Sequence, residues 1–165
     1  MTLPRRAVLL AGIALLAAGP AAAQVTGTNQ RFEMTATTTA SGEAVYRLWS
    51  DPATWTSWDA LVDRASLSGA GVGARGKLKG KSGPESTITV TVAEPGRRFA
   101  YAATGPGVRI LYEREYGAGS PARITHRVTF SGLVGGALAG GNLGRQFREG
   151  LPAQMNRIKA LAERG

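Results

Sequence analysis

The first alternating segment of the chain predicts a half-buried β-strand at residues 31–39. Its apolar side chains, Phe32, Met34 and Ala36, fall on one face, and polar side chains stand between them. Such alternation is typical of a strand with one face in the core and the other in solvent. The apolar residues that come next have helical spacing, and Ser41 precedes them as a candidate N-cap. A short amphipathic helix is therefore predicted directly after the first strand.

A second short helix is predicted at residues 54–61, where it carries Trp55 and Trp58. Asp51 can cap this helix, and Pro52 fits a first helical position. The rest of the pattern is a series of alternating runs separated by Gly and Pro, which is typical of a β-meander. The runs predict strands near 63–69, 74–81, 86–94, 97–103, 108–117 and 121–131.

Hairpin partners place their apolar residues on the same face of a sheet, which gives a prediction of the register. Symmetric turns pair Val92 with Phe99, Phe99 with Tyr112, Tyr101 with Ile110, Tyr112 with His126, and Glu115 with Arg123. The apolar residues then share one face. The opposite face collects charged side chains: Arg75, Lys77, Lys79, Glu113, Glu115, Arg123 and Arg127.

The last pattern in the chain predicts a long amphipathic helix. Apolar residues recur at helical spacing from Leu143 to Leu161, and Pro152 lies inside this stretch, where we expect a kink. A Gly-rich apolar loop at 132–141 precedes the helix. Because the apolar stripe of the helix matches the apolar face of the sheet, the predicted fold class is α+β, with about seven antiparallel strands and the helix packed on their concave face.

The N-terminus has the layout of a cleavable export signal. Arg5 and Arg6 precede an apolar run, and small residues that end at Ala23 follow it. We expect residues 1–23 to be removed, so that the protein is exported to the periplasm or secreted. An uncleaved anchor and a twin-arginine signal are the alternatives. The remaining chain is expected to be a polar linker at 24–30 and a single domain at 31–164.

The amino-acid composition excludes several kinds of catalytic and metal-binding site. The chain has a formal net charge of +9 and contains one His and no Cys, which excludes thiol catalysis, disulfides and thiolate metal sites. Its acidic residues are not clustered, so neither a metal nor a cofactor is expected. The protein is expected to be a monomer. Nucleic-acid binding is not expected, because the basic residues have no exposed aromatic side chains between them and the protein is expected to be exported.

The order of elements resembles that of the START-like superfamily with its helix-grip fold. The residues that carry the resemblance are the Trp49, Asp51, Trp55 and Trp58 pattern and the C-terminal segment from Gly150 to Glu163. Within the superfamily, the chain is most similar to the polyketide cyclase/dehydrase-like branch, whose members are often called SRPBCC proteins. The resemblance implies a deep cavity between the sheet and the last helix that holds lipids or other apolar molecules. It does not imply a reaction.

In the predicted register, the inward positions of the sheet and of the long helix place fourteen residues around that cavity: Met34, Trp55, Trp58, Ile88, Val90, Phe99, Tyr101, Ile110, Tyr112, His126, Val128, Phe147, Leu151 and Met155. Tyr101, Tyr112 and His126 are candidates for recognition or proton transfer, and Arg114 for pairing with a carboxylate or enolate of the ligand. The alternatives are structural aromatic residues and an arginine that reaches solvent.

Three further segments have two interpretations each. Residues 71–76 match G-x-G-x-x-G, but they lead into a strand and not into a helix, which excludes a dinucleotide site. The basic stripe of Arg75, Lys77, Lys79 and Lys81 is either a solvated edge strand or a peripheral contact with an anionic membrane surface. The 132–141 loop is either a cavity lid or a flexible connector.

The sequence thus favours a carrier or sensor in the cell envelope that binds a small hydrophobic or lipid-like ligand. A polyketide cyclase/dehydrase-like enzyme is the first alternative. A protein-interaction module, in which side chains fill the cavity, is the second.

Overall fold

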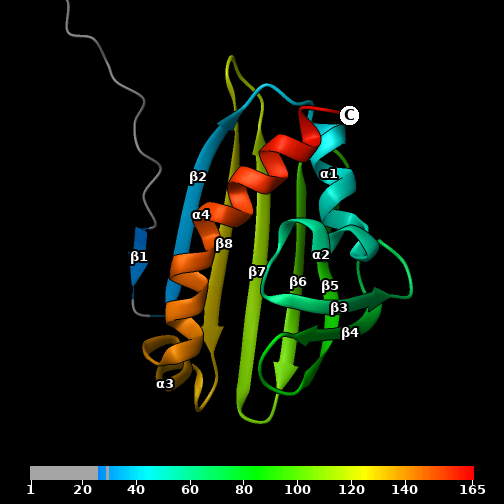
Figure 1. The fold of residues 1–165 in the computed structure, drawn as a ribbon. Helices are drawn as coiled ribbons and strands as arrows, with labels where there is room; N and C mark the ends of the chain where they lie inside the picture. The colour runs from blue at the N-terminus through cyan, green and yellow to red at the C-terminus, as the bar shows by residue number, and fades with distance from the viewer. Residues whose placement is uncertain (1–25, 29) are drawn as a thin grey trace, which may run out of the picture.

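The fold is one curved antiparallel sheet with its helices on one side (Figure 1). The computed structural model describes residues 26–28 and 30–165. In that part of the chain the sheet has eight strands in the order β1-β2-β8-β7-β6-β5-β4-β3. Their bounds are β1 Thr26–Thr28, β2 Arg31–Thr38, β3 Val62–Leu67, β4 Arg75–Gly80, β5 Glu85–Glu94, β6 Arg98–Gly105, β7 Val108–Gly117 and β8 Ala122–Ser131.

The predicted strands are all present, and β1 is an addition to them. β1 lies inside the segment expected to be a linker and pairs with β2, so the sheet has one strand more than predicted. The predicted signal at 1–23 lies outside the described residues. β3, and not β4, forms the edge of the sheet beyond the basic stripe, so the interpretation of β4 as an edge strand was wrong.

The register differs from the prediction, although most inward positions do not change. Tyr101 pairs with Tyr112 instead of Ile110, because the hairpin turn is centred on Pro106 and Gly107, one residue later than expected. Gly107 has a φ of 70°, a conformation that favours glycine. The same shift places Arg114, and not Tyr112, opposite Phe99. The turn between β7 and β8 is also centred later, which corrects three predicted pairs: Arg114 and not Tyr112 lies opposite His126, Thr125 opposite Glu115, and Gly117 opposite Arg123.

A β-bulge explains the one predicted residue that changes face. The ladder between β5 and β6 skips Thr91, so Val92 lies opposite Ala100 instead of Phe99. The other shifts equal two residues, and a shift of two keeps a side chain on its face. For this reason the predicted inner face is correct except at Val92, although the predicted partners are not.

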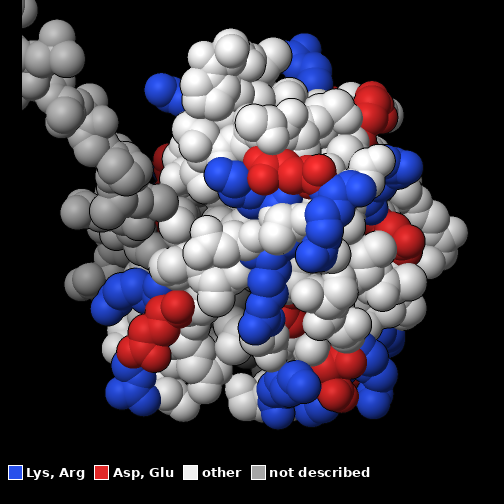
Figure 2. All heavy atoms as spheres, turned by 45° about the horizontal axis from the view of Figure 1, so that its top comes forward, with Lys and Arg blue, Asp and Glu red and all other residues white. Residues whose placement is uncertain are grey.

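The outer face is charged, as expected. The Arg127 Nε donates to Glu33 at 2.6 Å, and Arg31 donates to the same carboxylate at 3.2 Å. These bonds lower the pKa of Glu33. The top and the helix side of the molecule, which Figure 2 shows, carry basic side chains interspersed with acidic ones instead of one patch.

Two short helical segments connect β2 to β3. Helix α1 spans Gly42–Ser50, and the Ser41 hydroxyl accepts a hydrogen bond from the Ala44 N–H at 3.2 Å, which confirms the predicted cap. A 3-10 turn, η1 (Pro52–Thr54), leads into helix α2 (Trp55–Trp58). Helix α2 is shorter than the predicted 54–61. The chain becomes extended at Asp59, whose carboxylate accepts a bond from the Leu61 N–H.

The long helix α4 spans Asn142–Ala162 and packs against β2, β8, α1 and α2. It bends near its middle (Figure 1), which is where Pro152 lies. After its last turn, the Glu163 carboxylate accepts bonds from the Thr38 hydroxyl and the Thr39 N–H, both at 2.9 Å. These bonds fasten the end of α4 to the end of β2. None of the helices in the described part of the chain is long and apolar enough to cross a membrane.

The segment 132–141 is not only a loop. Its residues Gly135–Gly140 form a short helix, α3, which packs on α4, β7 and β8. The contact is close because Gly144 of α4 has no side chain. A Cβ there would lie 1.8 Å from the Ala139 carbonyl oxygen of α3. The tip before α3 remains in solvent, with Leu133 98% exposed.

Candidate functional site

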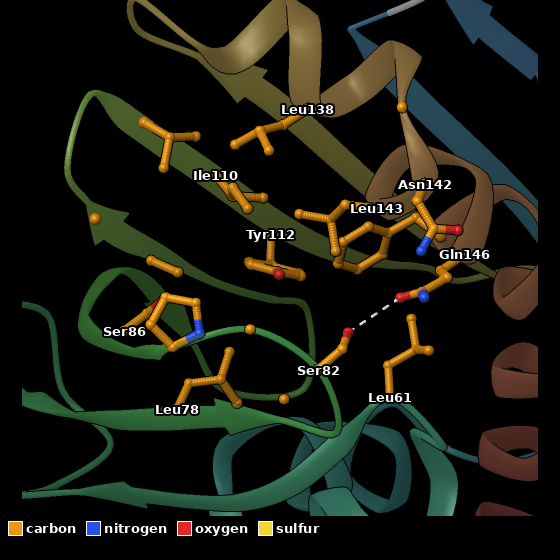
Figure 3. A pocket seen from close by; sticks show the side chains of 18 of the residues that line it. Leu61, Leu78, Ser82, Ser86, Ile110, Tyr112, Leu138, Asn142, Leu143 and Gln146 are labelled. Atoms are coloured by element: carbon orange, nitrogen blue, oxygen red, sulfur yellow. Dashed lines mark hydrogen bonds between the residues drawn. The ribbon is translucent and has the colours of Figure 1, made fainter.

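A cavity of about 600 Å³ lies between the sheet, the β4–β5 loop, α3 and the first turns of α4 (Figure 3). Its walls are mainly aliphatic, and its rim is formed by exposed residues such as Pro84 and Pro106. The described residues that line it are Asp59, Leu61, Val62, Leu78, Gly80, Ser82, Gly83, Pro84, Ser86, Tyr101, Ala103, Gly105, Pro106, Val108, Ile110, Tyr112, Val134, Ala137, Leu138, Gly141, Asn142, Leu143, Gln146 and Phe147.

Strand alternation and small side chains produce this space. Ala103 and Ile110 lie opposite each other on β6 and β7, and both line the cavity. The small Ala103 side chain leaves room above the centre of the sheet. At the mouth, the Ser82 hydroxyl of the β4–β5 loop donates to Gln146 Oε1 of α4 at 3.4 Å (Figure 3). The roof and the loop therefore meet across the cavity.

Four of the predicted cavity residues line this space: Tyr101, Ile110, Tyr112 and Phe147. The other ten are buried in the core and do not line it: Met34, Trp55, Trp58, Ile88, Val90, Phe99, His126, Val128, Leu151 and Met155. The physical reason is that α4 packs directly on the sheet along its C-terminal half, so the space remains only beneath its first turns. Of the expected lid residues, Val134 and Leu138 line the cavity, and Leu133 does not.

The two tyrosines form a stacked pair at the inner wall of the cavity. Their ring centroids are 4.7 Å apart with an angle of 21° between the ring planes. Burial raises the pKa of Tyr101 and of Tyr112, and the charge of Asp59 raises both further. Both phenols therefore keep their protons at neutral pH. They can donate hydrogen bonds to a molecule in the cavity.

Asp59 is a cavity residue that the sequence did not reveal. Its side chain is 4% exposed, and its Oδ1 accepts the Leu61 N–H at 3.0 Å. Burial raises the pKa of this carboxyl, while the Leu61 N–H bond and the charges of Arg114 and Arg157 lower it. The available signal was an acidic residue directly after Trp58, in a segment that the pattern assigned to a helix.

Arg114 is buried instead of reaching solvent. Its guanidinium carbon lies 5.0 Å from the Trp58 ring centroid, 5.0 Å from that of Tyr101 and 5.6 Å from that of Trp55. Its Nη2 donates to the Tyr101 hydroxyl at 3.4 Å, whereas Nε and Nη1 have no hydrogen-bond partner among the described residues. The guanidinium thus lies among aromatic rings beside the cavity and does not line it.

His126 also lies outside the cavity. Its side chain is 2% exposed, and its ring centroid is 5.7 Å from that of Trp49. Burial, assisted by the charge of Arg114, lowers the pKa of His126 to about 3, so the imidazole is neutral. Because its Nδ1 lies 2.9 Å from Gln154 Oε1, an acceptor, Nδ1 carries the proton.

G-x-G-x-x-G at 71–76 is explained by packing. A Cβ on Gly76 would lie 1.8 Å from the Ser66 carbonyl oxygen of β3, so this glycine permits close pairing of β3 and β4. The other glycines lie in the turn before β4. No helix follows the motif, which agrees with the exclusion of a dinucleotide site.

The sheet, the long helix and the cavity between them define a helix-grip protein. Residues 29–163 match the model of the family described as polyketide cyclase / dehydrase and lipid transport, and the chain belongs to that family. The predicted START-like fold and the predicted branch are therefore confirmed.

Solved structures share the fold at low sequence identity. A protein of Mesorhizobium loti has 14% identity and a TM-score of 0.63, over 82% of this chain and 98% of the other. A Helicobacter pylori protein has 14% identity and a TM-score of 0.65, over 80% and 86%. The di-domain ARO/CYC protein of the steffimycin biosynthetic pathway has 12% identity and a TM-score of 0.66, over 82% and 52%. No curated protein matches the chain.

Proposed function

We propose that this protein binds a small, largely apolar molecule in the cavity and acts as a carrier or sensor in the cell envelope. The observation that carries the proposal is the cavity itself, which has about 600 Å³ of space and aliphatic walls. Pockets of roughly 300–1,000 Å³ with apolar walls and a few polar groups are typical of sites for small ligands. Membership of a family named for polyketide chemistry and lipid transport supports the same class of ligand.

The two alternatives have less support. A cyclase/dehydrase-like enzyme would use Tyr101 and Tyr112, which line the cavity, but the other two candidates, Arg114 and His126, lie outside it. The low pKa of His126 and its bond to Gln154 also make it a poor proton shuttle. A protein-interaction module would have a cavity filled by side chains, and this cavity is open.

Filling the cavity is expected to abolish binding. Pyrene, a fluorescent hydrocarbon, is a suitable probe because it requires only apolar walls. Ala103→Phe places a ring in the space above the central strands. It should weaken pyrene binding at least about tenfold, because the ring fills the space that the probe would occupy. Fluorescence titration measures the change.

The matched control is Ala118→Phe, which adds the same ring in the exposed β7–β8 turn. It should leave the affinity for pyrene as it is in the wild type. Equal affinity in Ala103→Phe and the wild type, or no saturable binding by the wild type, contradicts the proposal.

The envelope location rests on the predicted export signal. We expect the protein recovered from the periplasmic fraction or the medium of its own host to begin at Gln24. Intact-mass measurement of that protein tests the cleavage site. A full-length chain found only in the cytoplasm contradicts the location and leaves the proposed ligand class unaffected.

Peripheral contact with an anionic membrane surface, a monomeric state and the absence of nucleic-acid binding remain predictions. The support for membrane contact is local. Leu133 is exposed next to Val134, a cavity-lining residue, and Arg109 is exposed on the adjoining end of β7. An apolar tip beside basic residues is typical of peripheral membrane attachment.

A further inference from the structure

The charge inside the cavity contrasts with the charge of the whole protein. The chain has a net charge of +9, yet the described residues that line the cavity include one carboxylate, that of Asp59, and no Lys, Arg or His. A site for fatty acids or phosphates needs a cation or several N–H donors that face the ligand. These walls offer no cation, so they do not favour an anion.

The inner wall instead offers two phenol hydroxyls and one acid. The Tyr101 oxygen already accepts a bond from Arg114, so its own O–H remains to donate elsewhere. The Tyr112 hydroxyl makes no hydrogen bond with another described residue. It lines the cavity on the ring that stacks against Tyr101 (Figure 3).

Asp59 provides the complementary acceptor. Its Oδ1 accepts the Leu61 N–H, the Gln154 side chain also bonds to the carboxyl, and the side chain lines the cavity. A carboxylate has about four lone pairs, so it retains acceptor capacity beyond these two bonds. Asp59, Tyr101 and Tyr112 line the same cavity, and the charge of Asp59 raises the pKa of both phenols. The cavity therefore combines two phenol donors and a carboxylate acceptor within mainly apolar walls.

We infer that Asp59, Tyr101 and Tyr112 form a recognition site for an uncharged oxygen, a hydroxyl or carbonyl group at one end of an otherwise apolar ligand, and that carboxylate ligands are excluded. This inference rests on the proposed function and specifies its ligand class. The tyrosines donate hydrogen bonds to the ligand oxygen, and the Asp59 carboxylate accepts a hydrogen bond from a ligand hydroxyl.

Arg114 does not overturn this selectivity, because it is not available to an anionic ligand. Its guanidinium is covered by the rings of Trp55, Trp58 and Tyr101, and it does not line the cavity. It acts through the Tyr101 hydroxyl and is a positioning residue. An anion in the cavity would share it with the Asp59 carboxylate, and like charges in a medium of low polarity repel strongly.

Three probes with one ring system test the inference: pyrene, 1-pyrenemethanol and 1-pyrenecarboxylate. Their affinities are measured by fluorescence titration at about pH 8, where an ordinary carboxyl is ionised. We expect 1-pyrenemethanol to bind about tenfold more tightly than pyrene, because its hydroxyl makes hydrogen bonds with these groups that the hydrocarbon cannot make. The carboxylate should bind about a hundredfold more weakly than the alcohol, because its charge is desolvated beside Asp59.

Two variants assign the effect to residues. Tyr112→Phe keeps the ring stack and should reduce the preference for the alcohol over pyrene from about tenfold to about threefold, since one donor is lost. Tyr116→Phe is the matched control, because it removes a hydroxyl from the same strand that bonds the Ala40 carbonyl at 3.1 Å outside the cavity. It should retain the full preference.

Asp59→Asn should improve binding of the carboxylate probe relative to the alcohol about tenfold, because the repelling charge is gone. If this variant does not fold, Tyr112→Phe and the three probes still decide the question. Equal affinities for the three probes overturn the inference and leave the proposed function intact. Tightest binding of the carboxylate also overturns it, and failure of pyrene itself to bind is a failure of the proposed function.

Discussion

Acidification from neutral pH to about pH 4 is expected to remove about 3 kcal/mol of folding stability through His126 alone. The imidazole is buried, and its pKa is lowered to about 3 in the folded protein, against 6.5 for an unperturbed histidine. Below pH 6.5 the unfolded chain therefore takes up a proton that the folded protein does not. This contribution to stability is complete above that pH and declines as the pH falls toward the folded value.

The experiment compares urea unfolding of the wild type and of His126→Asn across this pH range. Asn keeps an N–H near the position of Nδ1, from which Gln154 Oε1 can accept, and it does not titrate. Other groups titrate in both proteins. Glu33 and Glu163 have lowered pKa values, so their contributions to folding stability are lost in acid. Asp59 has a raised pKa, so its protonation in acid favours the folded protein. The difference between the two proteins isolates His126. A parallel decline in both proteins contradicts the assignment.

Arg114→Ala is expected to lower the free energy of unfolding by about 3–5 kcal/mol. The substitution removes a side chain that fills the space among three aromatic rings, and it removes the positive charge that most lowers the pKa of the buried Asp59 carboxyl. The loss of that charge should also raise the pKa of Asp59 further. Chemical denaturation measures the first effect, and the pH dependence of stability measures the second.

Arg114→Met separates packing from charge, because Met fills a similar volume without a cation. It should cost less than Arg114→Ala. Adding Asp59→Asn to Arg114→Met should recover part of the loss, since no buried charge then remains uncompensated. A cost below about 1 kcal/mol for Arg114→Ala would show that the guanidinium is solvated and not buried.

Alternation and helical spacing were sufficient to predict the strands β2 to β8, the two short helices after β2, α4 and most of the inner face of the sheet. These features depend on periods of two and 3.6 residues, which are visible in the sequence. Cross-strand partners depend on where each turn is centred. Because the turn before Val108 was predicted one residue too early, Ile110 was predicted as the partner of Tyr101, whereas the observed partner is Tyr112. The bulge at Thr91 had no signal in the pattern.

The position of the cavity was harder to predict than the existence of an inward face. Both Tyr101 and Val128 point inward and are buried, but only the first lines the cavity. The difference depends on how closely α4 and α3 approach each strand, which is set by contacts such as that of Gly144 with Ala139. Asp59 was missed for a related reason, because its role depends on the chain leaving helix α2 early.

The most direct test of a ligand site in this cavity is the location of bound pyrene by nuclear Overhauser effects in solution. We expect contacts between the probe and the methyl groups of Ile110, Leu138 and Leu143, which line the cavity. Contacts with the exposed apolar side chains of Val72 and Leu133 alone would place the probe on the surface and contradict the account.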